Sequence, residues 1–322
     1  MIIVIKMYKT DIETNKTTET RNFEKGIWIN MVAPTEDEIK LVCKKINMQE
    51  EFIRYSLDYE EKARIDYEEE DNTILFIIDV PILEKENNEQ VYSTMPLGLI
   101  VVRDDYFITV SLKSNKIIQE IESNKMKSTL ITYKKSRMIL QIFYKNAEMY
   151  LKYLKRINKE TEIAENVLKT SQKNKELLKM LSLEKSLVYF TTSLKSNEVV
   201  MEKTLRGKII KLYAEDEDIL EDAIIENKQA IEMAKIYSDI LNGTMDAYAS
   251  IISNNLNGVM KFLTSITIIL AIPTMIASYW GMNVQVPMQY VESKWPFFIV
   301  VAASIILGII AMIWLKKRDM LD

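Results

Sequence analysis

Two apolar stretches near the C-terminus decide the organisation of this chain: residues 262–280 read FLTSITIILAIPTMIASYW, and residues 295–315 read WPFFIVVAASIILGIIAMIWL. Both stretches are free of charge, and a helix needs roughly 20 such residues to cross a bilayer. Tyr279 and Trp280 end the first stretch and Trp295 opens the second, as aromatic residues do at membrane interfaces. The sequence therefore predicts two membrane-spanning helices.

Basic residues predict how these helices are oriented. Lys261 precedes the first span and Lys316, Lys317 and Arg318 follow the second, whereas the segment 281–294 between them contains only Lys294. Because basic residues favour the cytoplasmic side, both termini are expected there, with 281–294 as an external loop and 316–322 as a basic cytoplasmic tail. The first residues do not resemble a signal peptide. We expect a multi-pass protein of the cell (inner, cytoplasmic) membrane.

The region before the spans has two compositions. Up to residue 112, short runs rich in Ile, Val, Tyr and Thr alternate with polar turns and predict strands in an α/β cytoplasmic domain, residues 1–112. Thr35 and Glu38 form a capping-box pattern that opens a helix reaching about Lys45. The predicted strands are 2–7, 27–32, 73–80, 97–102 and 106–111.

From residue 113 the pattern becomes helical. Apolar residues recur at spacings of three and four, which predicts a helical hairpin or bundle over 113–216. A long stalk helix is expected over 217–280, continuing into the first span, and its 64 residues would extend about 95 Å. Gly243 and Gly258 are the positions where it could bend.

Composition limits the chemistry. The chain has no histidine and one cysteine, and it lacks a glycine-rich phosphate loop, so the usual catalytic and zinc constellations are missing and an enzyme is not expected. Oxygen ligands remain, and these suit magnesium. Cys43 lies on the apolar face of the predicted helix and is expected to pack there. No nucleic-acid partner is predicted.

A stripe of small and polar residues marks the first span. Steps of three and four residues from Asn257 reach Met260, Thr264, Thr267, Ala271, Thr274 and Ser278. Hydroxyls and amides in hydrocarbon are costly, so this face should meet protein or water. Helix packing and pore lining remain equally open. A pore would need several copies of the chain, with Leu263 and Met260 as an apolar constriction.

The end of the first span carries a resemblance. Tyr279-Trp280-Gly281-Met282-Asn283, followed by a short loop, a second span and a Lys-Lys-Arg tail, resembles the CorA magnesium-transporter family. Upstream, Asn257-Gly-Val-Met-Lys-Phe-Leu-Thr264 and Pro273 are similar to the family's pore segment. The resemblance implies a homopentameric funnel that transports Mg²⁺ passively, with some Co²⁺ and Ni²⁺.

Gly281, Met282 and Asn283 would form the selectivity filter. Mg²⁺ gives up its waters reluctantly, and a ring of Asn283 carbonyls could accept hydrogen bonds from the hydrated ion. Many relatives place an acidic residue in the loop after a Met-Pro pair, whereas Val286-Pro287-Met288-Gln289 is neutral here.

Acidic residues at the start of the long helix have two interpretations. Glu215 to Asp218, with Glu221 and Asp222, complement a helix dipole. The resemblance implies instead that carboxylates between subunits bind cytoplasmic Mg²⁺ as a regulatory ion. Asp222 is the candidate for this role, with a partner in the segment 84–89.

Two other functions stay open. A zinc transporter of the same superfamily would share the architecture, although Met282 favours magnesium. A membrane-anchored, coiled-helix tether or signalling protein would share the periodicity, but it has no use for a polar stripe.

Overall fold

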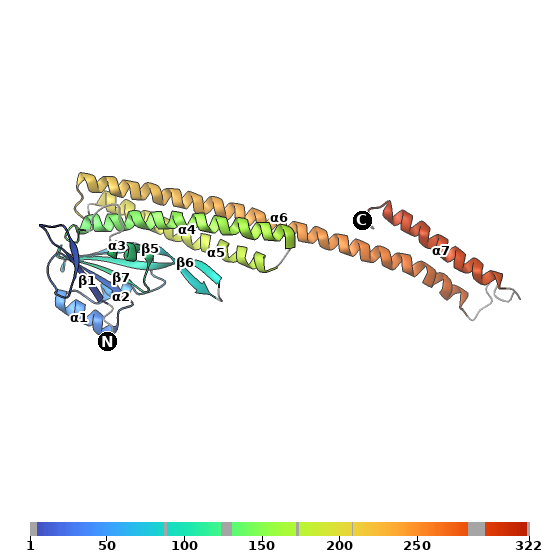
Figure 1. Cartoon of the computed structure of the whole chain (residues 1–322), viewed down its shortest axis with the longest axis horizontal. Coiled ribbons are helices and arrows are strands. Elements are labelled where there is room, and N and C mark those ends of the chain that lie inside the picture. Colours follow the sequence, from blue (N-terminus) through green and yellow to red (C-terminus); the bar gives the residue numbers. More distant parts are fainter. Residues whose placement is uncertain are drawn as a thin grey trace. The chain divides into compact units, whose positions relative to one another are not determined.

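The computed structural model describes residues 5–86, 89–123, 131–171, 174–207, 209–282 and 294–320 (Figure 1). The chain divides into two compact units, Met1–Gly243 and Thr244–Asp322. One helix, α6 (Ala214–Trp280), begins in the first unit and ends in the second.

The first unit is built on a mixed seven-stranded sheet with the strand order β2-β1-β3-β7-β6-β5-β4. β3 and β7 are parallel, and the other neighbouring strands are antiparallel. The sheet confirms the predicted α/β class. The strands are β1 (Ile5–Thr10), β2 (Thr17–Thr20), β3 (Ile27–Val32), β4 (Arg64–Glu68), β5 (Thr73–Glu86), β6 (Glu89–Val102) and β7 (Tyr106–Ser111).

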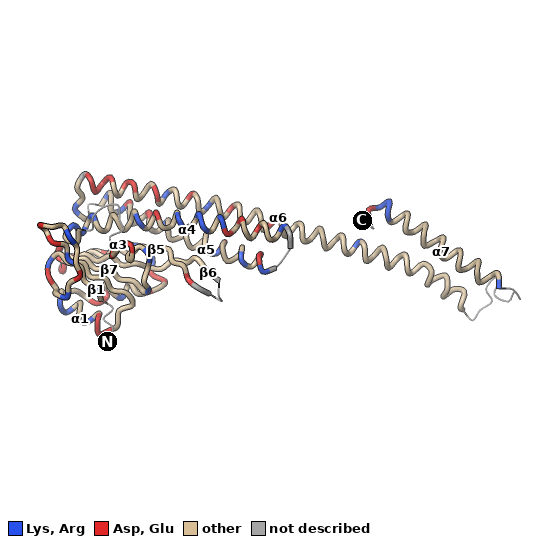
Figure 2. Tube along the Cα trace, viewed as in Figure 1, with Lys and Arg blue, Asp and Glu red and all other residues tan. Residues whose placement is uncertain are grey.

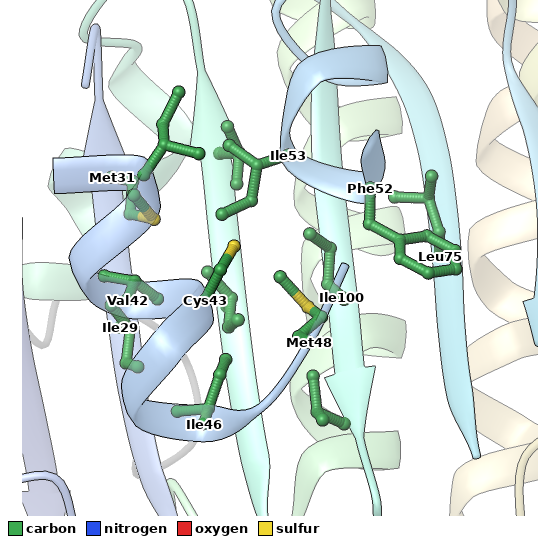
Figure 3. Packing of buried hydrophobic residues seen from close by; sticks show 14 of the residues in the cluster. Ile29, Met31, Val42, Cys43, Ile46, Met48, Phe52, Ile53, Leu75 and Ile100 are labelled. Atoms are coloured by element: carbon green, nitrogen blue, oxygen red, sulfur yellow. The ribbon is translucent and has the colours of Figure 1, made fainter. Parts of the chain in front are cut away.

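One face of the sheet is covered by α1 (Glu36–Ile46) and α2 (Glu51–Tyr55), and their apolar side chains meet those of the central strands (Figure 3). The capping box is confirmed. Thr35 Oγ1 accepts a hydrogen bond from Glu38 N, and the Glu38 carboxylate accepts one from Thr35 N. Cys43 is 5 % exposed within this core, and burial raises the pKa of its thiol to about 11. Its predicted packing role is therefore confirmed.

Long helices cover the opposite face (Figure 1). α4 (Lys135–Ser171) and α5 (Asn174–Gly207) form the predicted antiparallel hairpin, and the short α3 (Lys116–Glu122) packs against α4. Phe143 of α4 meets Phe76 of β5 edge to face at 6.1 Å between ring centroids. The first part of α6 is joined to α5, where Asn227 Nδ2 donates to Leu194 O at 2.9 Å. The sheet therefore lies between two helical layers.

Several predicted boundaries were wrong. β1 continues beyond the predicted end at Met7 to include Tyr8, Lys9 and Thr10, because these residues pair with β2; the predicted residues 2–4 lie outside the described residues. β5 and β6 continue past the predicted limits at Val80 and Leu97 and form one long hairpin. β2 and β4 were not predicted at all. α6 begins at Ala214 instead of residue 217, because Asp216 N and Glu217 N already donate to Tyr213 O. It runs through Gly243 and Gly258 without a break.

Candidate ion pathway

The second unit contains two helices that are long and apolar enough to cross a membrane, the end of α6 and α7 (Trp295–Lys316). Acidic and basic residues are frequent in the first part of α6 and nearly vanish in its second part and in α7 (Figure 2). Only 6 % and 11 % of the most apolar segments of these helices are buried within the chain. Most of this apolar surface is therefore available to lipid or to other chains.

The predicted pore-lining residues all lie on α6 and are all exposed within the single chain. Helical periodicity places them along one side of α6. Two of them are large and apolar, Met260 with 53 % and Leu263 with 57 % of the residue exposed. The full set is Asn257, Met260, Leu263, Thr267, Ala271, Thr274 and Ser278.

The hydroxyl groups of this stripe are bonded to their own helix. Thr264 Oγ1 donates to Met260 O and Thr267 Oγ1 to Leu263 O, both at 2.8 Å. Thr274 and Ser278 make the same bond to the carbonyl four residues earlier. The hydroxyl hydrogens are thus satisfied, and each hydroxyl oxygen still has acceptor capacity on the exposed side.

A different side of α6 is the least exposed. Ser265 is buried, and its Oγ donates to Met320 O, just after α7, at 2.8 Å. Ile269, Ile272 and Ile276 on the same side are half-buried. Thr267 is two residues from Ser265, which at about 100° per residue places the stripe nearly opposite this side. Packing within one chain therefore does not explain the stripe.

The last residues of α6 lead into the predicted filter. Gly281 N donates to Ala277 O at 2.9 Å, and a Cβ at Gly281 would lie 3.3 Å from that same oxygen. A side chain at this position would press on the end of the helix. Met282 is 47 % exposed. Asn283 and the predicted outer loop as far as residue 293 lie outside the described residues.

At the other end of α6, Asp222 is exposed, and no ion pair to it is present in the part of the chain that the structure describes. Glu84, the first residue of the segment expected to face Asp222, is paired with Lys113 at 2.5 Å. This hydrogen bond raises the pKa of Lys113. Among the described residues, no three or more Asp, Glu or Cys side chains are grouped as metal ligands.

Sequence reasoning missed a buried ion pair within the acidic cluster. Asp216 is 2 % exposed and accepts from Arg137 Nε at 2.8 Å, while Arg137 Nη2 donates to Glu215 at 2.7 Å. These bonds, the one to Asp216 first, raise the pKa of Arg137. Asp216 is therefore a structural partner of α4 and is not free to bind metal. No spacing in the sequence relates residues so far apart.

A mixed α/β unit, a helix of 67 residues that begins in it and has an apolar second part, and a second apolar helix at the C-terminus are together typical of an integral membrane protein. The comparison with protein families is consistent with this class. A family model described as CorA-like Mg²⁺ transporter protein matches residues 23–317, and the chain belongs to this family. The predicted resemblance is confirmed.

Individual relatives cover nearly the whole chain. The cobalt/magnesium transport protein CorA of Methanocaldococcus jannaschii is 26 % identical over 99 % of both chains. The protein of the same description from Thermotoga maritima is 32 % identical over 43 % of this chain and 42 % of its own length.

Solved structures confirm the fold. The complete structure of the CorA magnesium transporter from Methanocaldococcus jannaschii matches with a TM-score of 0.79 at 24 % identity, over 97 % of both chains. The ZntB cytoplasmic domain from Vibrio parahaemolyticus matches 78 % of this chain and 97 % of its own, with a TM-score of 0.58 at 11 % identity. At these identities the likeness concerns the fold alone.

Proposed function

We propose that this protein is a divalent-cation channel that carries hydrated Mg²⁺ across the cell membrane, with Co²⁺ and Ni²⁺ as further cargo. Its activity is then transport and not catalysis. The names of its relatives, which are cobalt/magnesium and magnesium transport proteins, support this ion class. Both termini and the α/β unit are proposed to lie in the cytoplasm, and residues 281–294 outside.

The observation that carries the proposal is the exposed stripe on α6. Apart from Met260 and Leu263 its residues are small or polar, and the stripe lies nearly opposite the side that is buried near Ser265. Five copies of α6 around an axis would turn the stripes inward and line a narrow pathway, and a homopentamer is the assembly we propose. Thr267, Thr274 and Ser278 would then offer hydroxyl oxygens to the waters around the ion.

Selection is proposed to occur at Gly281, Met282 and Asn283. A ring of amide carbonyls attracts a hydrated cation weakly, which suits conduction because the ion must also leave. Met260 and Leu263 would form the apolar constriction, nearer the start of the apolar part of α6. Asp222 is proposed to bind regulatory Mg²⁺ between neighbouring chains, so that abundant cytoplasmic Mg²⁺ favours the closed state.

The test is ion flux into liposomes that contain the purified protein. We expect Mg²⁺ uptake by the wild type and none by Asn283→Ala, which removes the amide ring but little volume. Assembly of the variant is checked by its elution in size-exclusion chromatography. Parallel assays with Co²⁺, Ni²⁺ and Zn²⁺ separate the magnesium function from zinc transport. Wild-type flux through Asn283→Ala would refute the filter assignment.

A further inference from the structure

The segment that follows α7 is fixed against α6, at the level where the first apolar span begins. Ser265 of α6 is fully buried, and its Oγ donates to Met320 O at 2.8 Å. Met320 N in turn donates to Leu315 O, in the last turn of α7, at 3.2 Å, and Leu315 is buried. Hydrogen bonds at both ends therefore hold residues 316–320 beside α6.

Four basic residues, which we call the basic cluster, lie at this level. Lys316, Lys317 and Arg318 follow the last apolar residue of α7, where basic residues gather (Figure 2). Lys261 precedes Ser265 by one helical turn, and residues four apart are neighbours on one side of a helix. Lys261 thus lies on the side of α6 that contacts the segment after α7. All four basic residues are exposed.

The charge of the basic cluster is not balanced within the chain. No ion pair to any of its residues is present among the residues that the structure describes. Between residues 247 and 320, Asp319 is the only described acidic residue, so four cations and one carboxylate leave a net charge of +3. Asp246 lies 15 residues before Lys261, which is about 22 Å along the helix. The cluster therefore needs an anion from outside the chain.

Apolar side chains border the basic cluster and identify the kind of anion. Phe262 of α6 and Ile313 and Trp314 of α7 are all exposed. The Arg318 guanidinium lies over the Trp314 ring, with Cζ 5.5 Å from the ring centroid, and an exposed aromatic ring beside a cation is typical of the headgroup level of a bilayer. A free phosphate ion would contact the cations alone. A phospholipid would contact the cations with its phosphate and the apolar side chains with its acyl chains.

We propose that the basic cluster is the headgroup site of an anionic phospholipid, which joins α6 to the end of α7 by contacting Lys261 and residues 316–318 together. The bond from Ser265 to Met320 brings the two halves of this site to the same level. A zwitterionic phospholipid would bind more weakly, because its own ammonium group is repelled by the cluster. The inference rests on the two apolar helices crossing the membrane and not on the transported ion.

Lipid binding to the full-length protein in detergent tests this site. Native mass spectrometry measures the affinity for phosphatidylglycerol and for phosphatidylcholine with the same acyl chains. We expect at least tenfold tighter binding of phosphatidylglycerol. Glycerol phosphate, which has the anionic group but no acyl chains, should not displace it at equal concentration. Equal affinity for the two lipids, or displacement by glycerol phosphate, would overturn the proposal.

Charge variants locate the site. The triple variant Lys316→Gln, Lys317→Gln, Arg318→Gln should lose affinity for phosphatidylglycerol on the order of 100-fold, because each cation near anionic headgroups contributes about fivefold. Lys294→Gln removes a cation at the other end of α7 and should bind as the wild type does. Lys261→Gln alone should weaken binding about fivefold, which tests the site even if the triple variant does not assemble. An equal loss in Lys294→Gln and Lys261→Gln would contradict a site at the cluster.

Ser265→Ala tests whether the site has two halves. This variant keeps every charge and removes the hydrogen bond to Met320, so the affinity for phosphatidylglycerol should fall several-fold. Unchanged affinity would show attraction to charge alone and would overturn the joining of α6 to α7. Elution in size-exclusion chromatography checks the assembly of each variant. Ion flux is not part of these measurements, so their outcome is independent of the proposed transport function.

Discussion

The guanidinium of Arg137, in the first turn of α4, donates from Nε to the buried carboxylate of Asp216, in the first turn of α6, across 2.8 Å. This pair fixes the start of α6 to the helical layer on the sheet. The carboxylate is 3 % exposed, so it depends on Arg137 for its charge partner.

Arg137→Met should therefore destabilise the α/β unit by about 3 kcal/mol, because it leaves the Asp216 charge buried and unpaired. Urea unfolding of the full-length protein, followed by circular dichroism, measures this loss. Arg206→Met is the matched control, since Arg206 forms an exposed pair with Glu202 at 3.4 Å and should cost less than about 0.5 kcal/mol. Equal losses in the two variants would contradict a structural role for Arg137.

The stability of the protein should fall as pH rises through the range in which Asp79 ionises. Its pKa is about 6 in the folded protein and 3.8 without the fold, so the folded state holds the proton more tightly. Stability is then highest below about pH 4 for this group, falls up to about pH 6, and stays lower above it.

Asp79→Asn should remove this dependence and stabilise the protein by about 2 kcal/mol near neutral pH. Thermal unfolding of both proteins across the pH range provides the measurement. The hypothesis fails if the variant is less stable than the wild type above about pH 6.

Met260→Ser and Leu263→Ser should raise ion leak, because a hydroxyl hydrates the narrow apolar segment that we propose on α6. Current recordings in planar bilayers measure the leak with the filter intact. Ile269→Ser is the control, since Ile269 lies on the half-buried side of α6 near Ser265. If the control leaks as much as the other two, the constriction is elsewhere.

Asp222→Asn should weaken the protection by Mg²⁺ against proteolysis of α6, because the carboxylate whose repulsion the ion relieves is gone. Titration of Mg²⁺ against cleavage compares the midpoints of variant and wild type. Asp218→Asn removes an exposed carboxylate one helical turn earlier and should leave the midpoint unchanged. Identical midpoints in all three proteins would refute the regulatory role of Asp222 and leave it only the interaction with the helix dipole.

Predictability of the fold from sequence varied with the kind of strand. Ile27–Val32 and Tyr106–Ser111 were predicted to the residue, because these neighbouring strands are almost wholly buried and are rich in β-branched and aromatic residues. β2 and β4 are the two edge strands, with the sequences Thr-Thr-Glu-Thr and Arg-Ile-Asp-Tyr-Glu. Their polar residues suit an edge, and only pairing with β1 and β5 makes them strands.

Two prolines explain why the central hairpin was predicted too short. The first predicted strand stopped just before Pro81, and the second began just after Pro96, because proline usually interrupts a strand. Asp79 N–H points away from β6 to Asn197, so Asp79 and Pro96 form a pair without mutual hydrogen bonds, as do Pro81 and Thr94. The nitrogens of Pro81 and Pro96 thus face the sides on which pairing with β4 and β7 has already ended. Their lack of an N–H therefore removes no hydrogen bond between strands.

The candidate pathway could be predicted only in part from the sequence. Periodicity along one helix identified the stripe from Asn257 to Ser278, because its members share a face by geometry alone. It could not show that Ser265 bonds to Met320, nor that Asp216 is taken by Arg137, because such contacts depend on how distant segments fold together.

The hydroxyls of the stripe also bear on the biogenesis of the protein. Each donates to a carbonyl of its own helix, so a single chain can enter the lipid without leaving these hydrogens unpaired. Insertion then does not require neighbouring chains, and under the proposed assembly newly made protomers could diffuse in the bilayer before they meet. In the pentamer that we propose, a water-filled pathway would arise only at that meeting, which would protect the cell from leakage through incomplete assemblies.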